Sequence, residues 1–428
     1  MMSVQYILLN EYDEIEGVFD RKIKHDSKKV LELKKHINPN RLMGKKMGVM
    51  EPSQMKVAMI CNWRTPCGIS TYSNYLATAL RSKVKELKIF SEIEDKADTT
   101  HDEEENVVRC WRRGESMLDT TKRINAWKAD FVIIQHEFGI FPKATYFLQL
   151  LQGIENIPHF VVLHSIYGNH LDKTICTSAC KNIICHSNEA KETLYGIGHE
   201  TNLIQVIPHG CVVYDDNQEL WNMFQTPYAI VQFGFGFFYK GVDRAIEAVG
   251  HLKASDEKFK DIFYCYLCSE SANASTTHKQ YHRHLNDLIE KLGLQDNVVI
   301  LRKYHSEKII KNYLRTAKLA LFPYVTDPTN IVFGASGAIR IAMGCNTPVI
   351  ASESHMYDDL EGVVPRPSSP LELSKEIDKV FSDEAYKRKL VEKNQLYIRE
   401  NDWNITADRY IKAIQNIMIK ENYIEIKE

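Results

Sequence analysis

Residues 330–352 read NIVFGASGAIRIAMGCNTPVIAS, and the stretch divides into a loop, a helix and a buried strand. The helix is expected to open at Ala338, directly after a loop of four small residues: Gly334, Ala335, Ser336 and Gly337. The run PVIAS at 348–352 has the compact apolar character of an interior parallel strand. A loop, helix and strand in this order indicate an α/β fold.

The start of this helix suits an anion. Its first N–H groups have no partner within the helix, and they coincide with the positive end of the helix dipole. We expect the bare backbone of 334–337 to bind phosphate there. Each such contact contributes only about 0.3–1 kcal/mol, so a diphosphate requires several donors and a cation as well. Close packing of the helix on a sheet is the alternative reason for the small residues.

Short apolar strands alternate with helices along most of the chain. We expect strands at 55–61, 87–90, 131–134, 160–163, 182–185 and 203–207, and then at 228–233, 262–267, 298–301, 319–322 and 347–351. Strands separated by helices at this spacing are typical of doubly wound parallel sheets. The predicted fold class is therefore α/β, with two Rossmann-like domains facing a cleft and an N-terminal appendage.

Composition points to a globular chain without a membrane span. The 428 residues are 44% hydrophobic and 26% charged, with a formal net charge of −2. No apolar run approaches the roughly 20 residues that a spanning helix needs. Acids interrupt the N-terminal stretch MMSVQYILLNEYDEIEG, which therefore lacks a signal-peptide core. We expect a cytoplasmic protein, and the ten cysteines lack metal-site spacing, so we expect no metal.

One segment departs from the balanced charge. Between Arg21 and Lys46 lie ten basic residues against Asp26 and Glu32. Such a segment could contact a polyanion, either a nucleic acid or the anionic surface of a membrane. The commoner explanation is the solvated face of a surface helix. Both interpretations stay open.

Parallel sheets bind ligands at the carboxyl ends of their strands, and polar residues follow several predicted strands. Four of them are histidines: His136, His164, His186 and His209. Together they are expected to bind hydroxyls and, in the case of His136 and His164, to assist proton transfer. Gly68 follows the first strand, where a missing side chain permits close approach to a ligand.

In the second half of the chain, basic residues lie near the ends of predicted strands, as the histidines do in the first half. Lys240 comes shortly after the loop that begins at Gly234, and it could neutralise a departing diphosphate. Arg340 lies one turn inside the 338 helix and is expected either to reach the same anion or to pair with an acid such as Asp327. The acids that follow the last strand, Asp358 and Asp359, could contact a ribose or a hydroxyl, but the commoner expectation is that they are solvated.

These motifs, in this order, resemble the group 1 glycosyltransferases of the GT-B fold. The resemblance covers about residues 55–420. It rests on VAMICNWRTPCGISTYSNYLATAL, DFVIIQHEFGIF, FVVLHSIY, NIICHSNEAKETL, VIPHGC, IVQFGFGFFYKGVDRAIEAV and LALFPY with GAIRIAMGCNTPVIAS. It implies four parts: a basic extension (1–54), an acceptor domain (55–225), a nucleotide-sugar donor domain (226–400) and a helix crossing back to the first domain (401–428).

The resemblance also implies a reaction. The family moves a sugar from a nucleotide diphosphate sugar, here linked to UDP or GDP, to a hydroxyl, usually with retention at the anomeric carbon. By this resemblance, Gly68 lies against donor phosphates or acceptor, and His164 stands near the reacting sugar. Lys240 steadies the diphosphate that the amides of 334–337 hold. No metal or other cofactor is required.

The chain departs from the family at two places. Phe333 and Ile341 occupy positions where the family has two glutamates that contact sugar and ribose, and Phe235 replaces an arginine. A glycosyltransferase-like binding protein without catalysis is therefore one alternative. A second is a transferase acting on duplex DNA, as in the phage DNA glucosyltransferases, and the basic segment motivates it. A nucleotide-sugar epimerase is a third. The acceptor stays open among a glycan, a lipid-linked group and a DNA base.

Overall fold

The computed structural model describes residues 50–176, 180, 182–199, 204–214, 220–269 and 276–425. By its internal contacts the chain divides into two units, Met1–Glu51 and Pro52–Glu428. The second unit contains every element named below. The basic segment Arg21–Lys46 lies outside the described residues.

The first half of this unit is built on a seven-stranded parallel sheet in the order β3-β2-β1-β4-β5-β7-β8. Its strands are β1 (Lys56–Cys61), β2 (Glu86–Glu92), β3 (Val107–Trp111), β4 (Phe131–His136), β5 (His159–Leu163), β7 (Ile183–Cys185) and β8 (Ile204–Val206). The helices between them are α5 (Gly68–Arg81), α6 (Leu118–Trp127), α7 (Ala144–Gly153), α8 (His170–Cys176) and α9 (Asn188–Gly196). We call this part the first lobe.

The second lobe is built on a five-stranded parallel sheet in the order β11-β10-β9-β12-β14. Its strands are β9 (Ala229–Phe235), β10 (Phe263–Ser269), β11 (Val298–Arg302), β12 (Leu319–Leu321) and β14 (Val349–Ile350). Its helices are α10 (Val242–Ser255), α11 (Thr276–Lys291), α12 (Glu307–Thr316), α13 (Gly337–Gly344), α14 (Pro370–Ser382) and α15 (Glu384–Glu400). Single turns η3 (Phe238–Lys240), η4 (Glu257–Phe259) and η5 (His355–Leu360) complete it.

Both faces of the second sheet are covered, as its near-continuous apolar strands require. Side chains alternate between the faces along β10. Tyr264 and Cys268 pack into one hydrophobic cluster with α10, whereas Cys265 and Leu267 pack into another with α13. Each sheet therefore has a core on both sides, and only its edges and strand ends are left for ligands.

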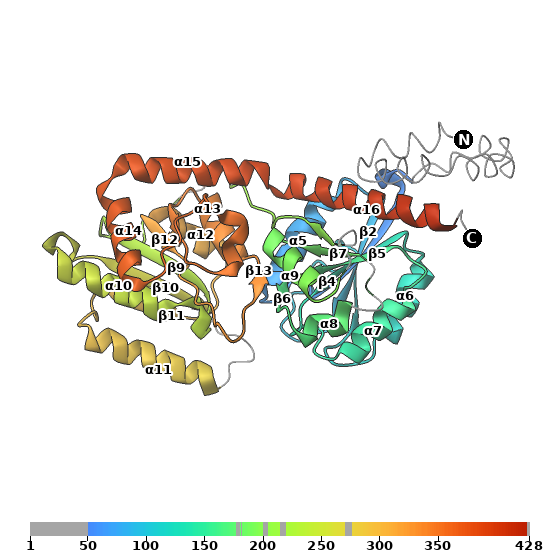
Figure 1. Ribbon diagram of the computed structural model, residues 1–428, viewed down its shortest axis with the longest axis horizontal. Helices are drawn as coiled ribbons and strands as arrows, with labels where there is room; N and C mark the ends of the chain where they lie inside the picture. Colours follow the sequence, from blue (N-terminus) through green and yellow to red (C-terminus); the bar gives the residue numbers. More distant parts are fainter. Residues whose placement is uncertain are drawn as a thin grey trace, which may run out of the picture. The chain divides into compact units, whose positions relative to one another are not determined.

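Two further connections join the lobes. A two-residue strand of the first lobe, β6 (Ser165–Ile166), pairs antiparallel with β13 (Phe333–Gly334) of the second. The last described helix, α16 (Trp403–Glu425), follows α15 but packs on α5 of the first lobe. Figure 1 shows α15 running along the second lobe and α16 continuing along the first. The hydroxyls of Tyr72 and Tyr410 meet at 2.7 Å in this contact.

The predicted α/β architecture is confirmed, because both sheets have the strand order of doubly wound folds. The sequence did not indicate β3, β6 or β13. In each sheet the winding reverses at one point, between β1 and β4 in the first and between β9 and β12 in the second. Ligands of such sheets bind in the crevice outside the carboxyl ends of the strands at these points.

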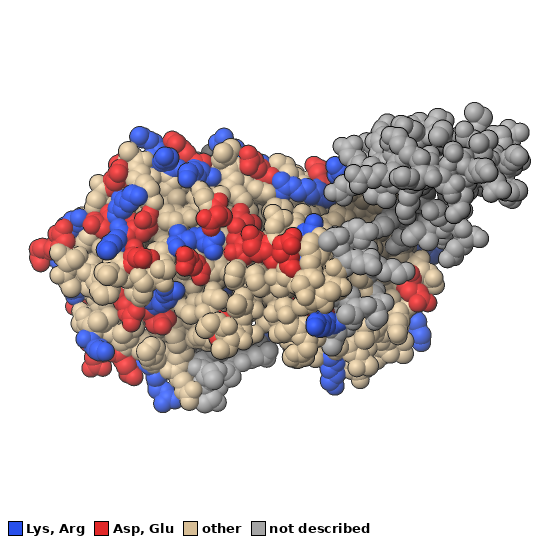
Figure 2. Space-filling view, in the orientation of Figure 1, with Lys and Arg blue, Asp and Glu red and all other residues tan. Residues whose placement is uncertain are grey.

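The surface is mixed in charge. Figure 2 shows Lys and Arg side chains interspersed with Asp and Glu over much of one face. Across the described parts of the chain, no helix is long and apolar enough to cross a membrane.

Candidate functional site

The reversal point of the second sheet brings Lys240 beside the segment that follows β12. The link is Gly241, which begins α10 in the left-handed conformation with φ of 62°. A Cβ on Gly241 would lie 1.8 Å from the carbonyl oxygen of Pro323. Only glycine permits both this backbone conformation and this contact. The end of η3, and with it Lys240, is therefore held against the chain after β12.

Lys240 reaches a buried tyrosine in this segment. Its Nζ donates a hydrogen bond to the hydroxyl of Tyr324 at 2.7 Å and lies 3.9 Å from the centre of the Tyr324 ring. The same hydroxyl lies 3.2 Å from Oγ of Ser336. Burial lowers the pKa of Lys240 and raises the pKa of Tyr324 to about 12. The phenol is therefore neutral at physiological pH.

The small-residue loop before α13 lies against the first lobe. Gly334 pairs with Ser165, and a Cβ on Gly337 would lie 3.2 Å from Nε2 of His209. Ser336 precedes the helix as its N-cap, but its side chain accepts no hydrogen bond from the helix. Its backbone N–H is used instead by the carbonyl of Met356, at 3.2 Å. The first turn of α13 thus has no side-chain cap, which leaves its N–H groups available to an anion.

Arg340 pairs with an acid, as one of the two expectations had it, but the partner is Asp359 and not Asp327. Its side chain is 1% exposed, and its guanidinium forms an ion pair with Asp359 while donating to the carbonyl oxygens of Ser336 and His209. Because its charge is matched inside the protein, Arg340 holds the loop before α13 to the segment that follows β8. An anion-binding role for Arg340 receives no support from this arrangement.

Three of the four strand-end histidines surround one tyrosine. Ring centres of His164, His186 and His209 lie 4.7, 5.4 and 4.8 Å from that of Tyr72 in α5. Burial lowers the pKa of all three imidazoles, that of His186 to about 4. His164 also contacts Oε1 of Gln135 through Nε2 at 2.8 Å. The carboxyl edge of the first sheet therefore presents neutral imidazoles.

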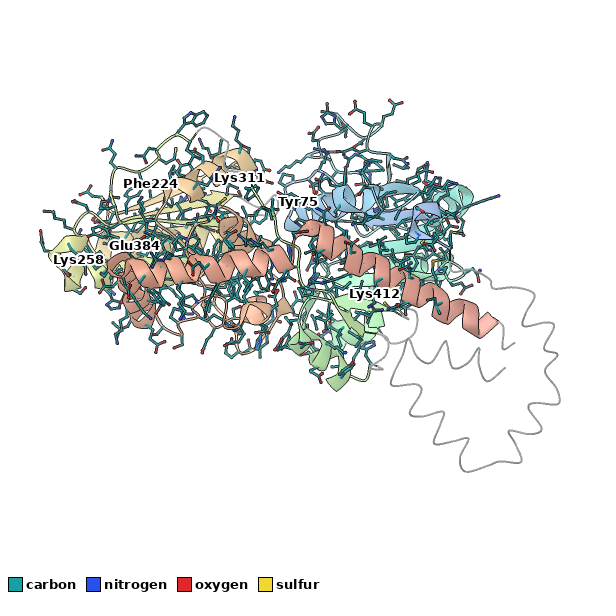
Figure 3. All side chains as sticks on the ribbon, turned by 90° about the horizontal axis from the view of Figure 1, so that it is seen from above. Tyr75, Phe224, Lys258, Lys311, Glu384 and Lys412 are labelled. Carbon is teal, nitrogen blue, oxygen red and sulfur yellow. The ribbon has the colours of Figure 1, made fainter. Side chains whose placement is uncertain are left out.

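Residues from the start of α16 close this cluster. Trp403 lies 4.9 Å from Tyr72 and 5.5 Å from His209 between ring centres, and it stacks on Tyr75 at 5.6 Å. Figure 3 shows Tyr75 on α5 near the point where α16 begins. A Cβ on Gly210 would lie 2.5 Å from the Trp403 ring, so glycine is required for this packing.

His136 lies apart from the other three histidines. Its side chain is 0% exposed, and ring centres of Phe138, Phe141 and Phe147 lie 4.6–5.5 Å away. Neither ring nitrogen has a hydrogen-bond partner among the described residues. Burial lowers its pKa to about 3, so the imidazole is neutral. This aromatic environment belongs to the core and does not support the catalytic role expected for His136.

The remaining predicted positions lie at backbone turns. Gly68 is exposed at the start of α5, and a Cβ at this residue would have no atom within 4 Å. Gly234, with φ of 148°, ends β9 such that a Cβ would lie 3.7 Å from Cε of Lys240. Ala335 is half-buried in the loop before α13. Gly68 is thus at the reversal point of the first sheet and Gly234 at that of the second.

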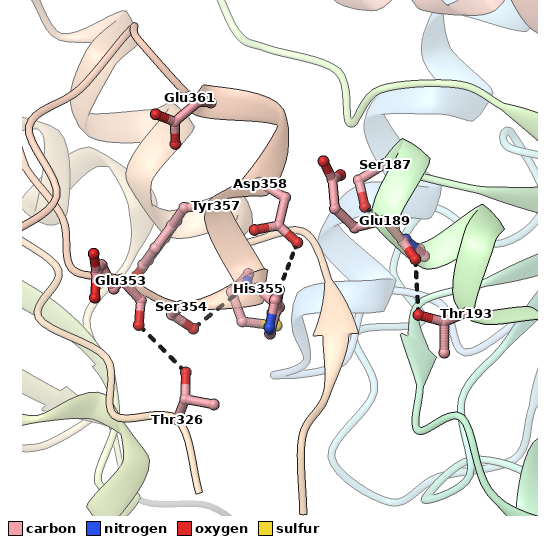
Figure 4. A network of polar contacts seen from close by, with 12 residues as sticks. Ser187, Glu189, Thr193, Thr326, Glu353, Ser354, His355, Tyr357, Asp358 and Glu361 are labelled. Carbon is pink, nitrogen blue, oxygen red and sulfur yellow. Dashed lines mark hydrogen bonds and ion pairs between the residues drawn. The ribbon is translucent and has the colours of Figure 1, made fainter. Parts of the chain in front are cut away.

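The acids after β14 are not solvated, which corrects a second expectation. Side chains of Asp358 and Asp359 are 7% and 8% exposed. Asp358 accepts from Nδ1 of His355 at 2.9 Å, and its pKa is raised by burial and, to a lesser extent, by Glu189 of α9. Figure 4 shows Glu189 beside Asp358 where the lobes meet. His355 in turn packs on Phe333, with ring centres 4.4 Å apart.

Sequence reasoning therefore missed two kinds of polar group at the site. Tyr324 had the character of an apolar strand end, and His355 stood in a loop with no distinctive spacing. The aromatic and imidazole residues just after β12 and β14 were the available signal, because those positions fall at the carboxyl edge of a parallel sheet.

Known proteins match both the fold and part of the sequence. Residues 215–397 match the family described as glycosyl transferases group 1. HepE of Anabaena, in a structure with UDP, superposes with a TM-score of 0.64 at 14% identity, covering 85% of this chain and 100% of that one. A glycosyltransferase of Rickettsia africae gives 0.66 at 15%, covering 85% and 99%. A UDP-forming α,α-trehalose-phosphate synthase of Burkholderia vietnamiensis gives 0.62 at 10%, covering 84% and 100%.

Two parallel sheets of doubly wound strand order, together with these likenesses, define the fold as GT-B. Within that fold, residues 215–397 are similar to the group 1 glycosyltransferases.

Proposed function

We propose that the protein transfers a sugar from a nucleotide diphosphate sugar, with UDP as the carrier, to an acceptor hydroxyl, with retention at the anomeric carbon. The observation that carries the proposal is the convergence of Lys240 with the uncapped start of α13, both at the reversal point of the second sheet. An ammonium group and helix N–H groups are the donors that a diphosphate requires.

The negative charge that develops in this reaction falls on the departing diphosphate. The bond between the anomeric carbon and the phosphate oxygen breaks, and its electron pair moves to that oxygen. The acceptor oxygen bonds to the anomeric carbon and loses its proton. Lys240 and the N–H groups in the first turn of α13 would neutralise the departing diphosphate, so that fixed protein groups supply the charge. UDP is preferred to GDP because HepE is described with UDP and with UDP-glucose, and the trehalose-phosphate synthase as UDP-forming.

The first lobe would bind the sugars. His164 is neutral, and a neutral imidazole forms hydrogen bonds with hydroxyls without attracting the diphosphate. Gly68 would give a ligand close access to the start of α5. We divide the chain accordingly into an extension (1–54), an acceptor domain (55–225), a donor domain (226–400) and a crossing helix (401–428). The close contact of α16 with α5 supports this last assignment.

The test is a comparison of nucleotides by titration calorimetry, followed by assays of hydrolysis and transfer. Wild type should bind UDP more tightly than GDP and release UDP from a UDP-sugar. Lys240→Ala should weaken UDP binding, whereas Lys258→Ala, which removes a surface lysine paired with Asp378, should leave it unchanged. A wild-type chain that neither binds a nucleoside diphosphate nor hydrolyses any nucleotide sugar contradicts the proposal. Binding without turnover favours the non-catalytic alternative, and a screen of glycan, lipid-linked and DNA hydroxyls identifies the acceptor.

A further inference from the structure

Tyr324 occupies a fixed place at the centre of the proposed diphosphate site. Its side chain is 1% exposed and packs against Tyr357 and Tyr239, with ring centres 5.1 and 6.0 Å away. Its carbonyl oxygen accepts a hydrogen bond from Oγ of Ser352 at 2.6 Å, just after β14. The ring therefore has little freedom to move.

The hydroxyl of Tyr324 joins two groups from different elements. It accepts a hydrogen bond from Nζ of Lys240, which follows β9, and lies within hydrogen-bond distance of Oγ of Ser336, which precedes α13. The phenol oxygen accepts from Lys240, and in its contact with Ser336 either hydroxyl can be the donor. When the phenol donates, the serine proton is available to a ligand, and the serine oxygen accepts no hydrogen bond from the helix.

The lysine is held by the ring as well as by the hydroxyl. Its Nζ lies 3.9 Å from the centre of the Tyr324 ring and 4.9 Å from that of Tyr239. A lysine side chain has many rotamers. If no contact orders the side chain beforehand, ligand binding must order it and lose that entropy. Contacts that order it beforehand favour binding, because less entropy is lost in the complex.

We propose that Tyr324 is a positioning residue that joins Lys240 and the hydroxyl of Ser336 into one group of donors for the diphosphate. The inference rests on the proposed function, which it deepens by naming the residue that organises the leaving-group site. Tyr324 acts through its two neighbours. The proposal predicts that the protein binds a ligand with two phosphates more tightly than a ligand with one. A diphosphate can contact the lysine and the start of α13 at the same time.

The first experiment measures the binding of UDP and of UMP to Tyr324→Phe. The ring is kept, so the core packing with Tyr357 stays, and only the oxygen is lost. We expect UDP binding to weaken about ten-fold, the effect of one hydrogen bond to a charged group, with less than a two-fold change for UMP. In a Lys240→Met background the same substitution should weaken UDP binding by a smaller factor, because only the contact with Ser336 is then left to lose. Tyr386→Phe, which removes a phenol hydroxyl from a contact with Glu376 on α14, is the matched control and should bind as wild type.

The second experiment needs no ligand. The rate of acetylation of Lys240 is measured by mass spectrometry at fixed pH, with the surface Lys258 as internal reference. Loss of the Tyr324 oxygen should free the amine and raise the rate at Lys240 several-fold relative to Lys258. Tyr386→Phe should leave the ratio unchanged.

The outcomes separate the two proposals. An unchanged acetylation ratio with additive effects of Tyr324→Phe and Lys240→Met on UDP binding overturns the role of Tyr324 and leaves the proposed function standing. Wild type that binds neither UDP nor GDP, together with a raised ratio in Tyr324→Phe, overturns the proposed function while confirming that Tyr324 restrains the lysine. Equal weakening for UDP and UMP also overturns the inference, because a general disturbance of the site would then explain it.

Discussion

The carboxyl edges of the two sheets are built alike but differ in charge. At the first edge, His164, His186 and His209 surround Tyr72, and burial keeps each imidazole neutral. At the second edge the basic side chain of Lys240 lies near a helix start without a side-chain cap.

This difference shows how one backbone plan can serve two kinds of ligand. Parallel strands deliver side chains to the same edge in both lobes, so topology fixes where a ligand binds. The side chains fix which ligand it is. Neutral imidazoles suit hydroxyls, and a lysine with helix N–H groups suits phosphate. The predictions below would break or sharpen this contrast.

Lys240→Ala should produce the largest effect. Removing a preorganised charge that stabilises a leaving group lowers turnover by about 10²–10³-fold. His164→Ala should leave UDP binding within a factor of two, because a neutral ring contributes no charge to the phosphate. Steady-state kinetics and UDP titration of the two variants check this. Equal loss of UDP binding in both would remove the contrast between the edges.

Gly241→Ala should cost about 3 kcal/mol or more of unfolding free energy, because the new Cβ would collide with the carbonyl of Pro323 in a strained backbone. Gly293→Ala is the matched control. Gly293 has the same φ of 62°, but nothing lies within 4 Å of its Cβ position, so only the backbone strain of about 1 kcal/mol remains. Urea denaturation of both variants measures the difference. Equal costs would mean that the fit of Gly241 against Pro323 is not tight.

Acid should destabilise the first lobe through its histidines. Their pKa values are lowered in the folded chain, to about 3 for His136 and about 4 for His186, whereas an exposed histidine in the unfolded chain has a pKa of 6.5. The folded state then binds fewer protons than the unfolded state below pH 6.5, so stability is full above that pH and falls as pH drops. The slope is at most about 1.4 kcal/mol per pH unit for each histidine. Buried Glu137, whose pKa is raised, acts in the opposite direction. Thermal unfolding between pH 8 and 5 measures the balance, and a midpoint that rises on acidification contradicts it.

His136→Leu should have the smallest effect at neutral pH. The ring nitrogens lie in an aromatic core without described partners, so an apolar replacement should change stability by no more than about 1.5 kcal/mol. Below pH 6 the stability of the variant should fall less steeply with acid than that of wild type. The variant lacks the histidine whose pKa is lowered by folding. Turnover should persist. Loss of turnover with unchanged stability would restore a catalytic role to this histidine.

Much of the fold could be predicted from the sequence because parallel strands are apolar throughout. The runs at 131–134 and 319–322 fall on β4 and β12. The strand β3 was missed because it is an edge strand whose residues are mostly half-exposed. The pair β6 and β13 was missed because two-residue strands have no periodicity, and their pairing depends on how the lobes meet.

The site was less predictable than the fold. Lys240 and the loop before α13 follow from position relative to strands, which local sequence reveals. The partners of Arg340 do not, because Asp359 and the carbonyl of His209 approach it only in the folded chain. Tyr324 likewise gains its significance from two residues, 84 positions before it and 12 after it.

The contact between Tyr72 and Tyr410 joins residues 338 positions apart. During synthesis the ribosome adds about 5–20 residues per second, so α5 emerges roughly 20–70 s before its partner on α16. Until then the apolar side of α5 that receives α16 is uncovered, and it is a natural surface for a chaperone. Nascent chains stalled before Trp403 should therefore be captured and degraded more readily than chains stalled after α16.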